Sequence, residues 1–169
     1  MKPTKKHRLP LSPITRTLWT TLALVGFVVG TLWAATLDRT EVTNRQYAEF
    51  ILATGKAPPQ HWPGTKAPKD MADAPATLID WHDAKTYCEW RGRQLPSQQE
   101  WQNACRAEGF QKVGDVWEWT RSEDEKGWKV LCGPMGTCDC SHSYKPEWKN
   151  AVKGFRCVGD MPVAMFSSE

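Results

Sequence analysis

The most apolar stretch of the chain lies near its start. Residues Leu18 to Leu37 contain no charged side chain, and about 20 apolar residues are enough for a helix to cross the hydrocarbon of a bilayer. Trp19 and Trp33 lie near the two ends of the stretch, where amphipathic rings favour the membrane interface. The pattern predicts a transmembrane helix over residues 18–37 that contacts the lipid bilayer.

The preceding residues predict the orientation of this helix. Residues 1–17 carry basic side chains and no acidic one, and such a tail stays in the cytoplasm by the positive-inside rule. We expect a single-pass protein of a bacterial-type inner (plasma) membrane, with residues 38–169 periplasmic or extracellular. The alternative is a cleaved signal peptide. Against it, the apolar stretch is long, and bulky Trp33 stands where the best cleavage site needs a small residue.

The segment after residue 37 carries the sequence signals of three capped helices. Thr43–Gln46 and Ser97–Glu100 are capping boxes, and Asp80 is a candidate N-cap. Apolar residues then recur at helical spacing, and a glycine ends each of the first two segments. These signals predict helices over residues 44–54, 81–91 and 98–105.

The remaining pieces of this segment are short. Residues 57–75, rich in Pro and Gly, predict an extended surface loop, and Arg121–Lys126 predicts a solvated charged turn. Short strands are predicted over residues 114–119, 129–132 and 154–158. Because such strands build little regular packing, we expect aromatic side chains and disulfides to hold this part together. Most of its tryptophans are therefore expected in the core.

Charge and cysteine content narrow the function classes. The chain carries a net charge of +3, but the N-terminal tail alone carries +5, so residues 38–169 sum to −2. No nucleic-acid partner is expected, because such binding needs clustered basic residues on the folded part. All six cysteines follow residue 37, which suits an oxidising compartment and up to three disulfides. The sequence alone leaves their pairing open.

Four phrases of the sequence resemble, in order, the landmarks of the formylglycine-generating enzyme family (sulfatase-modifying factors). They are LDRTEVTNRQYAEFILATG, APATLIDWHDAKTYCEWRGRQLPSQQEWQNACR, GDVWEWT and GFRCV. The resemblance implies an irregular α+β domain, related to C-type lectins, over residues 38–169. The family contains copper-dependent oxidases, iron-dependent enzymes, maturation and accessory proteins, and binding domains. Function must therefore be argued from the site rather than from the fold.

The resemblance also suggests roles for the cysteines. Cys88 and Cys157 stand where the family places one disulfide, and Cys105 is expected to pair with Cys138 or Cys140. Cys132 and the cysteine left over would form a third disulfide. Alternatively, Cys132 and Cys138 resemble the family's Cu(I)-binding catalytic pair, because soft thiolates select Cu(I), although their spacing is one residue too long.

A structural Ca²⁺ site is a further implication of the resemblance. The family holds the ion around the Gly-x-Val-Trp-Glu phrase, which corresponds to the Gly114 and Val116 carbonyls and the Glu118 carboxylate, with Gln111 in the place of an Asn. Oxygen ligands on one tight turn suit Ca²⁺. The alternative is that Glu118 only forms a hydrogen bond or salt bridge within the fold.

Two stretches that usually shape the family's substrate groove are short or missing. Only residues 107–113 separate the third helix from the GDVWEWT phrase, and the family's first strands do not precede the EVTN phrase. An oxidase needs a positioned substrate, so we expect a non-catalytic accessory or structural subunit of a membrane or periplasmic (redox) complex. The alternative is a copper-dependent oxidase, or a metal-dependent maturation factor, acting on an exported protein such as a sulfatase or redox enzyme.

A third class of function is a lectin-like binding module with an exposed aromatic pocket. Trp62 and Trp148 lie outside the helical stripes and are its candidates. His142 is a possible metal ligand, although a surface role is the simpler interpretation. No role is assigned to His61 or His82.

Overall fold

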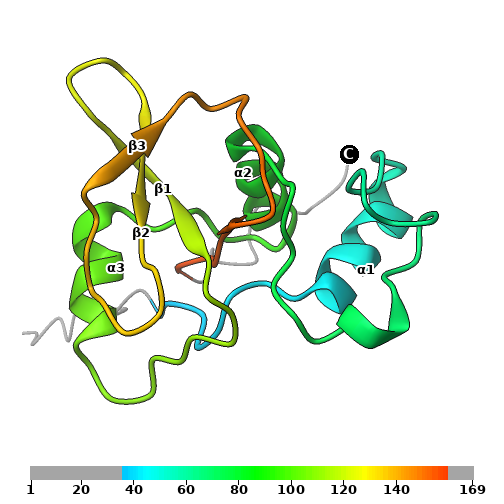
Figure 1. Cartoon of the computed structure of the whole chain (residues 1–169), viewed down its shortest axis with the longest axis horizontal. Helices are drawn as coiled ribbons and strands as arrows, with labels where there is room; N and C mark the ends of the chain where they lie inside the picture. Colours follow the sequence, from blue (N-terminus) through cyan, green and yellow to red (C-terminus); the bar gives the residue numbers. More distant parts are fainter. Residues whose placement is uncertain (1–35, 160–169) are drawn as a thin grey trace, which may run out of the picture. The chain divides into compact units, whose positions relative to one another are not determined.

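The computed structural model describes residues 36–159, which form a mixed α+β fold. In chain order the elements are α1 (Asn44–Thr54), the short 3-10 helix η1 (Lys69–Met71), α2 (Trp81–Trp90), α3 (Gln98–Cys105), β1 (Trp117–Glu123), β2 (Lys129–Cys132), β3 (His142–Tyr144) and β4 (Lys153–Gly154) (Figure 1).

The predicted membrane helix lies almost entirely outside the described residues. Within residues 36–159, no helix is both long and apolar enough to cross a membrane. Leu37, the last residue of the predicted span, forms an antiparallel bridge with Val158. A membrane helix would therefore have to end before this residue.

The three predicted helices are present, with their caps. Thr43 and Ser97 each accept a hydrogen bond from the backbone N–H three residues on, and the Gln46 and Glu100 side chains reach back to the cap N–H groups. Asp80 caps α2 in the same way through the N–H of Asp83. These bonds satisfy backbone groups that the first helical turn leaves unpaired.

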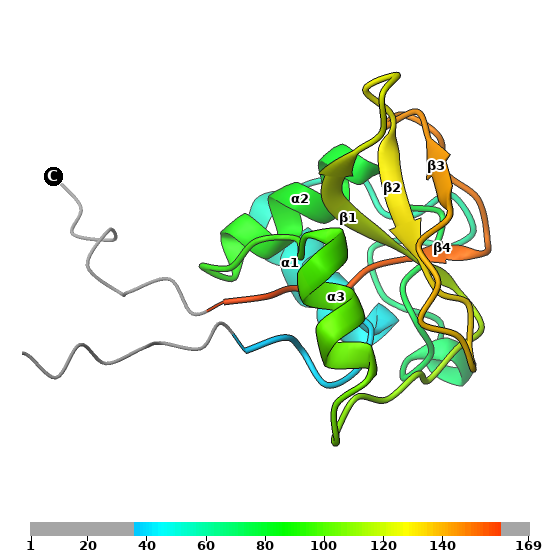
Figure 2. The ribbon, with the colours of Figure 1, turned by 90° about the vertical axis from the view of Figure 1, so that its left-hand side faces the viewer.

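The sheet is mixed and has the strand order β3-β2-β1-β4. Strands β1 and β2 pair antiparallel, as do β2 and β3, whereas β4 pairs parallel to β1. All four residues of β2 are buried, because both faces of this central strand are covered. Val130 and Cys132 pack in a cluster with Trp101 of α3, and Leu131 packs in the larger cluster that contains residues of α1 and α2. Figure 2 shows α3 lying beside β1 and β2.

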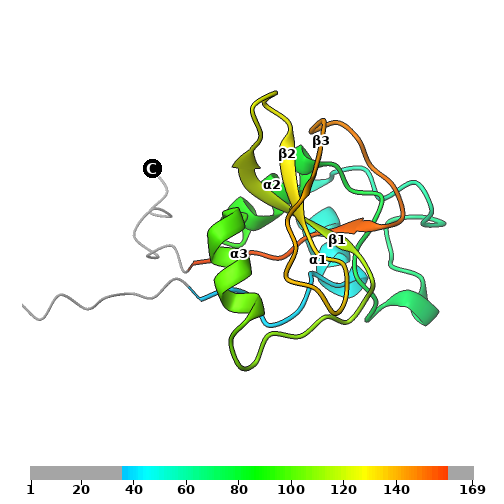
Figure 3. The same ribbon diagram turned by 60° about the vertical axis from the view of Figure 1, so that its left-hand side comes forward.

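The ends of the described chain lie side by side next to α3 (Figure 3). Asp38 donates its backbone N–H to the carbonyl of Cys157 at 2.8 Å, and Gly159 donates to Thr36 at 3.1 Å. The first and last segments of the described chain are therefore hydrogen-bonded to each other.

Several strand predictions were wrong in their bounds. β1 starts three residues later than predicted and continues through Glu123, so the predicted charged turn begins only at Asp124. Of the predicted strand over 154–158, only Gly154 lies in the ladder, together with Lys153 before it, whereas Val158 forms isolated bridges. β3 was not predicted, because its three residues carry no alternating apolar pattern.

The largest core cluster is aromatic. Tyr47, Phe50, Tyr87 and Phe155 pack with ring centroids between 5.3 and 6.2 Å apart. Such pairs add stabilisation beyond the burial of their area. The Cys88–Cys157 disulfide, which the family resemblance implied, joins α2 to the C-terminal segment in the same cluster.

Removing this disulfide is expected to destabilise the domain. Cys88→Ala should lower the free energy of unfolding by about 2–5 kcal/mol, the usual range for a native bridge in a small exported domain. Urea unfolding without reductant measures the change. The double variant Cys88→Ala/Cys157→Ala controls for the unpaired thiol of the single variant. Wild-type stability in both variants would contradict a structural role for the bridge.

Candidate functional site

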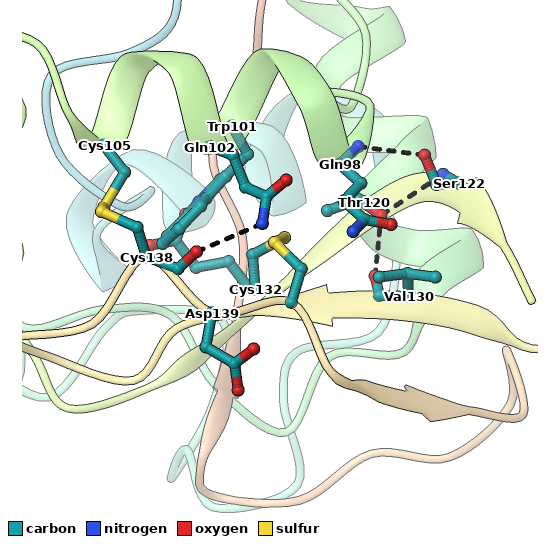
Figure 4. Close-up of a disulfide and its surroundings, with 12 residues drawn as sticks. Gln98, Trp101, Gln102, Cys105, Thr120, Ser122, Val130, Cys132, Cys138 and Asp139 are labelled. Atoms are coloured by element: carbon teal, nitrogen blue, oxygen red, sulfur yellow. Dashed lines mark hydrogen bonds between the residues drawn. A yellow bond between two sulfur atoms is a disulfide. The ribbon is translucent and has the colours of Figure 1, made fainter.

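The two cysteines of the predicted copper pair belong to different disulfides. Cys132, at the end of β2, bonds to Cys140, and Cys138 bonds to Cys105 of α3. Figure 4 shows both sulfur pairs beside α3, with the Gln102 amide donating to the carbonyl of Cys138. All six cysteines lie in the described part of the chain, and none of them is free.

This pairing leaves no thiolate for Cu(I). A metal ligand must be the deprotonated thiol, and each sulfur is instead bonded to another sulfur. Cys105 is bonded to Cys138, one of the two partners that the family resemblance left open, and Cys132 is bonded to Cys140. The sulfur donors at this place do not fit a copper centre.

The predicted calcium ligands lie around Glu118, a fully buried carboxylate on β1. Its Oε1 accepts hydrogen bonds from Lys112 Nζ at 2.7 Å and Arg156 Nη2 at 2.9 Å. Its Oε2 accepts from Arg156 Nε at 2.6 Å and the Trp101 indole at 2.9 Å. An ionised carboxylate offers about four lone-pair positions, and all of them are used.

Arg156 is the second centre of this cluster. Its remaining N–H donors bind the carbonyls of Asp38, Arg39 and Gln111 at 2.9–3.0 Å. Every donor of the guanidinium therefore has an acceptor. The Phe110 ring covers the guanidinium, with its centroid 4.0 Å from Cζ, so the charge is buried but fully compensated.

A second ion pair lies against the first. Lys112 Nζ is 3.1 Å from Glu41 Oε1, and the other Glu41 oxygen accepts from the backbone N–H of Val113 at 2.9 Å. Glu41 and Glu118 are fully buried, and Lys112 is 8% exposed. We call Glu41, Lys112, Glu118 and Arg156 the charge cluster.

The charge cluster lowers the pKa of Glu118. Burial raises the pKa of this carboxyl, but the charges and hydrogen bonds of Arg156, and then of Lys112, lower it below the ordinary value of 4.5. The Glu118 side chain is therefore held as a carboxylate.

Other residues of the predicted calcium site also make contacts within the fold. The Val116 carbonyl accepts from Lys112 Nζ at 2.7 Å. The backbone carbonyl of Gln111, whose side chain was the predicted ligand, accepts from Arg156. Gly114 packs against Pro75, where a Cβ would lie 2.6 Å from a ring carbon. Within residues 36–159, no group of three or more His, Cys, Asp or Glu side chains is placed to hold a metal.

The sequence prediction named Glu118 but missed Lys112, Glu41 and Arg156. Two of these stand inside the quoted phrases, Glu41 in TEVTN and Arg156 in GFRCV. For Arg156, a charge between apolar Phe155 and Cys157 was the available signal. No sequence signal connects Lys112 to residues as distant as Glu41.

The aromatic candidates differ in exposure. Trp62 is buried in the core at 6% exposure, whereas Trp148 is 49% exposed. Tyr144 and Trp128 lie beside Trp148, with ring centroids 5.8 and 6.4 Å away. We call Trp128, Tyr144 and Trp148 the aromatic patch.

Of the histidines discussed above, His61 is partly buried and His142 is exposed. The His61 ring nitrogens have no hydrogen-bond partner, and burial lowers the pKa of this side chain. The His142 ring packs on Trp117 at a centroid distance of 4.2 Å and lies 3.1 Å from the Ser141 hydroxyl.

Part of the chain matches a known protein family. Residues 31–113 match the model of the "Sulfatase-modifying factor enzyme 1-like domain" family. Residues 31–113 are therefore similar to a domain of the formylglycine-generating-enzyme type, and this range contains the first two of the four sequence phrases.

The chain is similar both to a protein named as the enzyme and to proteins named as inactive. It is 39% identical over 51 residues to the mouse "Inactive C-alpha-formylglycine-generating enzyme 2", covering 30% of this chain and 16% of the relative. It is 30% identical over 110 residues to the "Formylglycine-generating enzyme" of Thermomonospora curvata, covering 41% and 36%. The matches thus span well under half of these relatives' length.

A solved structure supports the fold. The crystal structure of CarF superposes with a TM-score of 0.56 at 16% identity, covering 76% of this chain and 87% of that one. At this level of identity the likeness concerns the fold alone.

The low pKa of Glu118 predicts acid sensitivity. A carboxyl whose pKa is lower in the folded state stabilises the fold above its unfolded value of 4.5 and loses that contribution as the pH falls through the folded pKa. The free energy of unfolding should therefore drop below about pH 4.5.

Glu118→Gln should remove part of this acid dependence. At neutral pH it is expected to be destabilised by about 3–5 kcal/mol, because Arg156 is left buried with a poorer partner. Urea unfolding between pH 3 and 7 measures both effects. Exposed Glu147 offers the matched control Glu147→Gln. Equal stability of Glu118→Gln and wild type would refute the importance of the cluster.

Proposed function

We propose that this chain is a membrane-anchored, outward-facing domain of the formylglycine-generating-enzyme type that acts as a non-catalytic accessory or structural subunit of a membrane or periplasmic complex. The observation that carries the proposal is the pairing of Cys132 and Cys138 with different partners. The two residues that would bind copper are thereby used to hold the fold.

The geometry around these cysteines supports a structural role. The Cys105–Cys138 bridge ties α3 to the loop after β2, and Cys132–Cys140 closes that loop on itself. The segment between α3 and β1 is short and its carbonyls and side chains bind the charge cluster. This part of the segment is thus used for packing, which supports a structural role. Similarity to proteins named as inactive agrees with a domain without catalysis.

The start of the described chain favours a location close to a membrane. Leu37 bridges to Val158, and Asp38 binds the Cys157 backbone, so the fold begins at the last residue of the predicted anchor. A domain joined to a membrane helix without a flexible linker stays near the bilayer. Its partners would then be membrane-bound or periplasmic proteins.

The aromatic patch is the proposed contact surface for a protein partner. Tryptophan and tyrosine are enriched among the residues that dominate binding energy in protein interfaces. Trp148 keeps about half of its surface exposed, whereas the tryptophans of α3 and β1 are more buried. A lectin-like function would use the same patch and is distinguished by the binding experiment below.

The state of the cysteines tests the absence of catalysis. We expect an alkylating reagent to label no cysteine before reduction and all six after it, as read from the intact mass of the protein purified from its native membrane. Two labelled thiols before reduction, together with stoichiometric Cu(I), would overturn the proposal in favour of the copper oxidase.

Mild-detergent purification from native membranes tests the accessory role. We expect a co-purifying protein whose affinity falls at least about tenfold in Trp148→Ala, a change of about 1.4 kcal/mol. Leu52→Ala is the control, because Leu52 is 64% exposed on α1 and lies outside the aromatic patch. A protein that purifies alone, or that binds glycans through Trp148 instead, contradicts the proposal.

A further inference from the structure

We infer that the ammonium group of Lys112 is the built-in structural cation of this domain, standing where the family resemblance implies a Ca²⁺ ion. The inference concerns the chemistry of the fold and is independent of the accessory function proposed above.

The surroundings of Lys112 Nζ carry the inference. The nitrogen donates hydrogen bonds to Glu118 Oε1 and the Val116 carbonyl, both at 2.7 Å, and lies 3.1 Å from Glu41 Oε1. An ammonium has three N–H donors. Two of them make these hydrogen bonds, and the buried Glu41 Oε1, which has no hydrogen-bond partner, lies within ion-pair distance of the nitrogen. Two of these oxygens, from Val116 and Glu118, are ligands that the resemblance assigned to calcium.

The distances are those of an ammonium rather than of a metal site. Charge-assisted N–H···O bonds are about 2.7–2.9 Å long, whereas Ca²⁺ needs about 6–8 oxygens at roughly 2.3–2.6 Å. The other Glu118 oxygen accepts from Arg156 and Trp101. Both Glu118 oxygens and the Val116 carbonyl, which the resemblance assigned to calcium, are therefore already bonded to groups of the protein.

The charge balance favours a monovalent cation. Glu41 and Glu118 supply two negative charges, and Lys112 and Arg156 supply two positive ones, all within ion-pair distance of one another. Replacing the ammonium by a divalent ion would leave one net positive charge in a buried site. An uncompensated buried charge is strongly unfavourable.

The consequence is a fold that needs no metal. Because Lys112 lies six residues before Glu118 in the chain, the cation is covalently attached and cannot be lost to a chelator or to a medium poor in calcium. The short segment that links α3 to β1 is thus fixed to β1 by its own lysine.

The first experiment uses the unmodified protein. Thermal unfolding of the wild-type chain is measured with excess chelator and with Ca²⁺ raised to millimolar concentration. We expect the same midpoint in every condition, since an ion that binds only the folded state would raise the midpoint with its concentration. A saturable rise with Ca²⁺, or a fall with chelator, overturns the inference.

The second experiment removes the ammonium while keeping the aliphatic stem. Lys112→Met is expected to lower the unfolding midpoint strongly, whereas Lys66→Met, which removes the same charge from an exposed position, should leave it unchanged. An unchanged midpoint in Lys112→Met shows that the ammonium is dispensable and overturns the inference. Should Lys112→Met not fold, the wild-type titration with Ca²⁺ decides the question alone.

Discussion

The buried ion pair between Glu118 and Arg156 is the interaction on which this domain depends. Glu118 lies on β1. Arg156 lies in the C-terminal segment, between Phe155 of the aromatic core and Cys157 of the disulfide with Cys88. Through its guanidinium the pair also binds the carbonyls of the entering chain and of the segment before β1. Three regions far apart in the sequence, residues 38–39, 111–118 and 156, thus meet at one pair of side chains.

Such a pair stabilises the fold only because its environment is complete. Removing two charges from water costs several kcal/mol per ion, and their attraction repays this only with good geometry and satisfied hydrogen bonds. Here both Glu118 oxygens and every Arg156 donor have partners. The Cys88–Cys157 disulfide, one residue from Arg156, holds the same segment covalently. The ionic and covalent links therefore fix the same part of the chain.

Local features were predictable from the sequence, and distant contacts were not. The three helices follow from capping residues and spacing that act within a few positions, so their bounds agree with the structure to within a residue. β3 and the ends of β1 depend on pairing partners elsewhere in the chain, which residue patterns do not reveal. Glu118 was identified from the family phrase, but the cation beside it was not. The position of Lys112 matters only because folding brings Glu41 next to it.

The short segment between α3 and β1 is held in place by the charge cluster. Phe110 covers Arg156, the Gln111 carbonyl accepts from it, Lys112 bridges the two carboxylates, and the Val113 N–H binds Glu41. Four consecutive residues are therefore committed to one buried cluster. A segment so committed fixes the position of α3 relative to the sheet. Such rigidity agrees with the proposed docking role, because a preorganised surface loses less conformational entropy on binding.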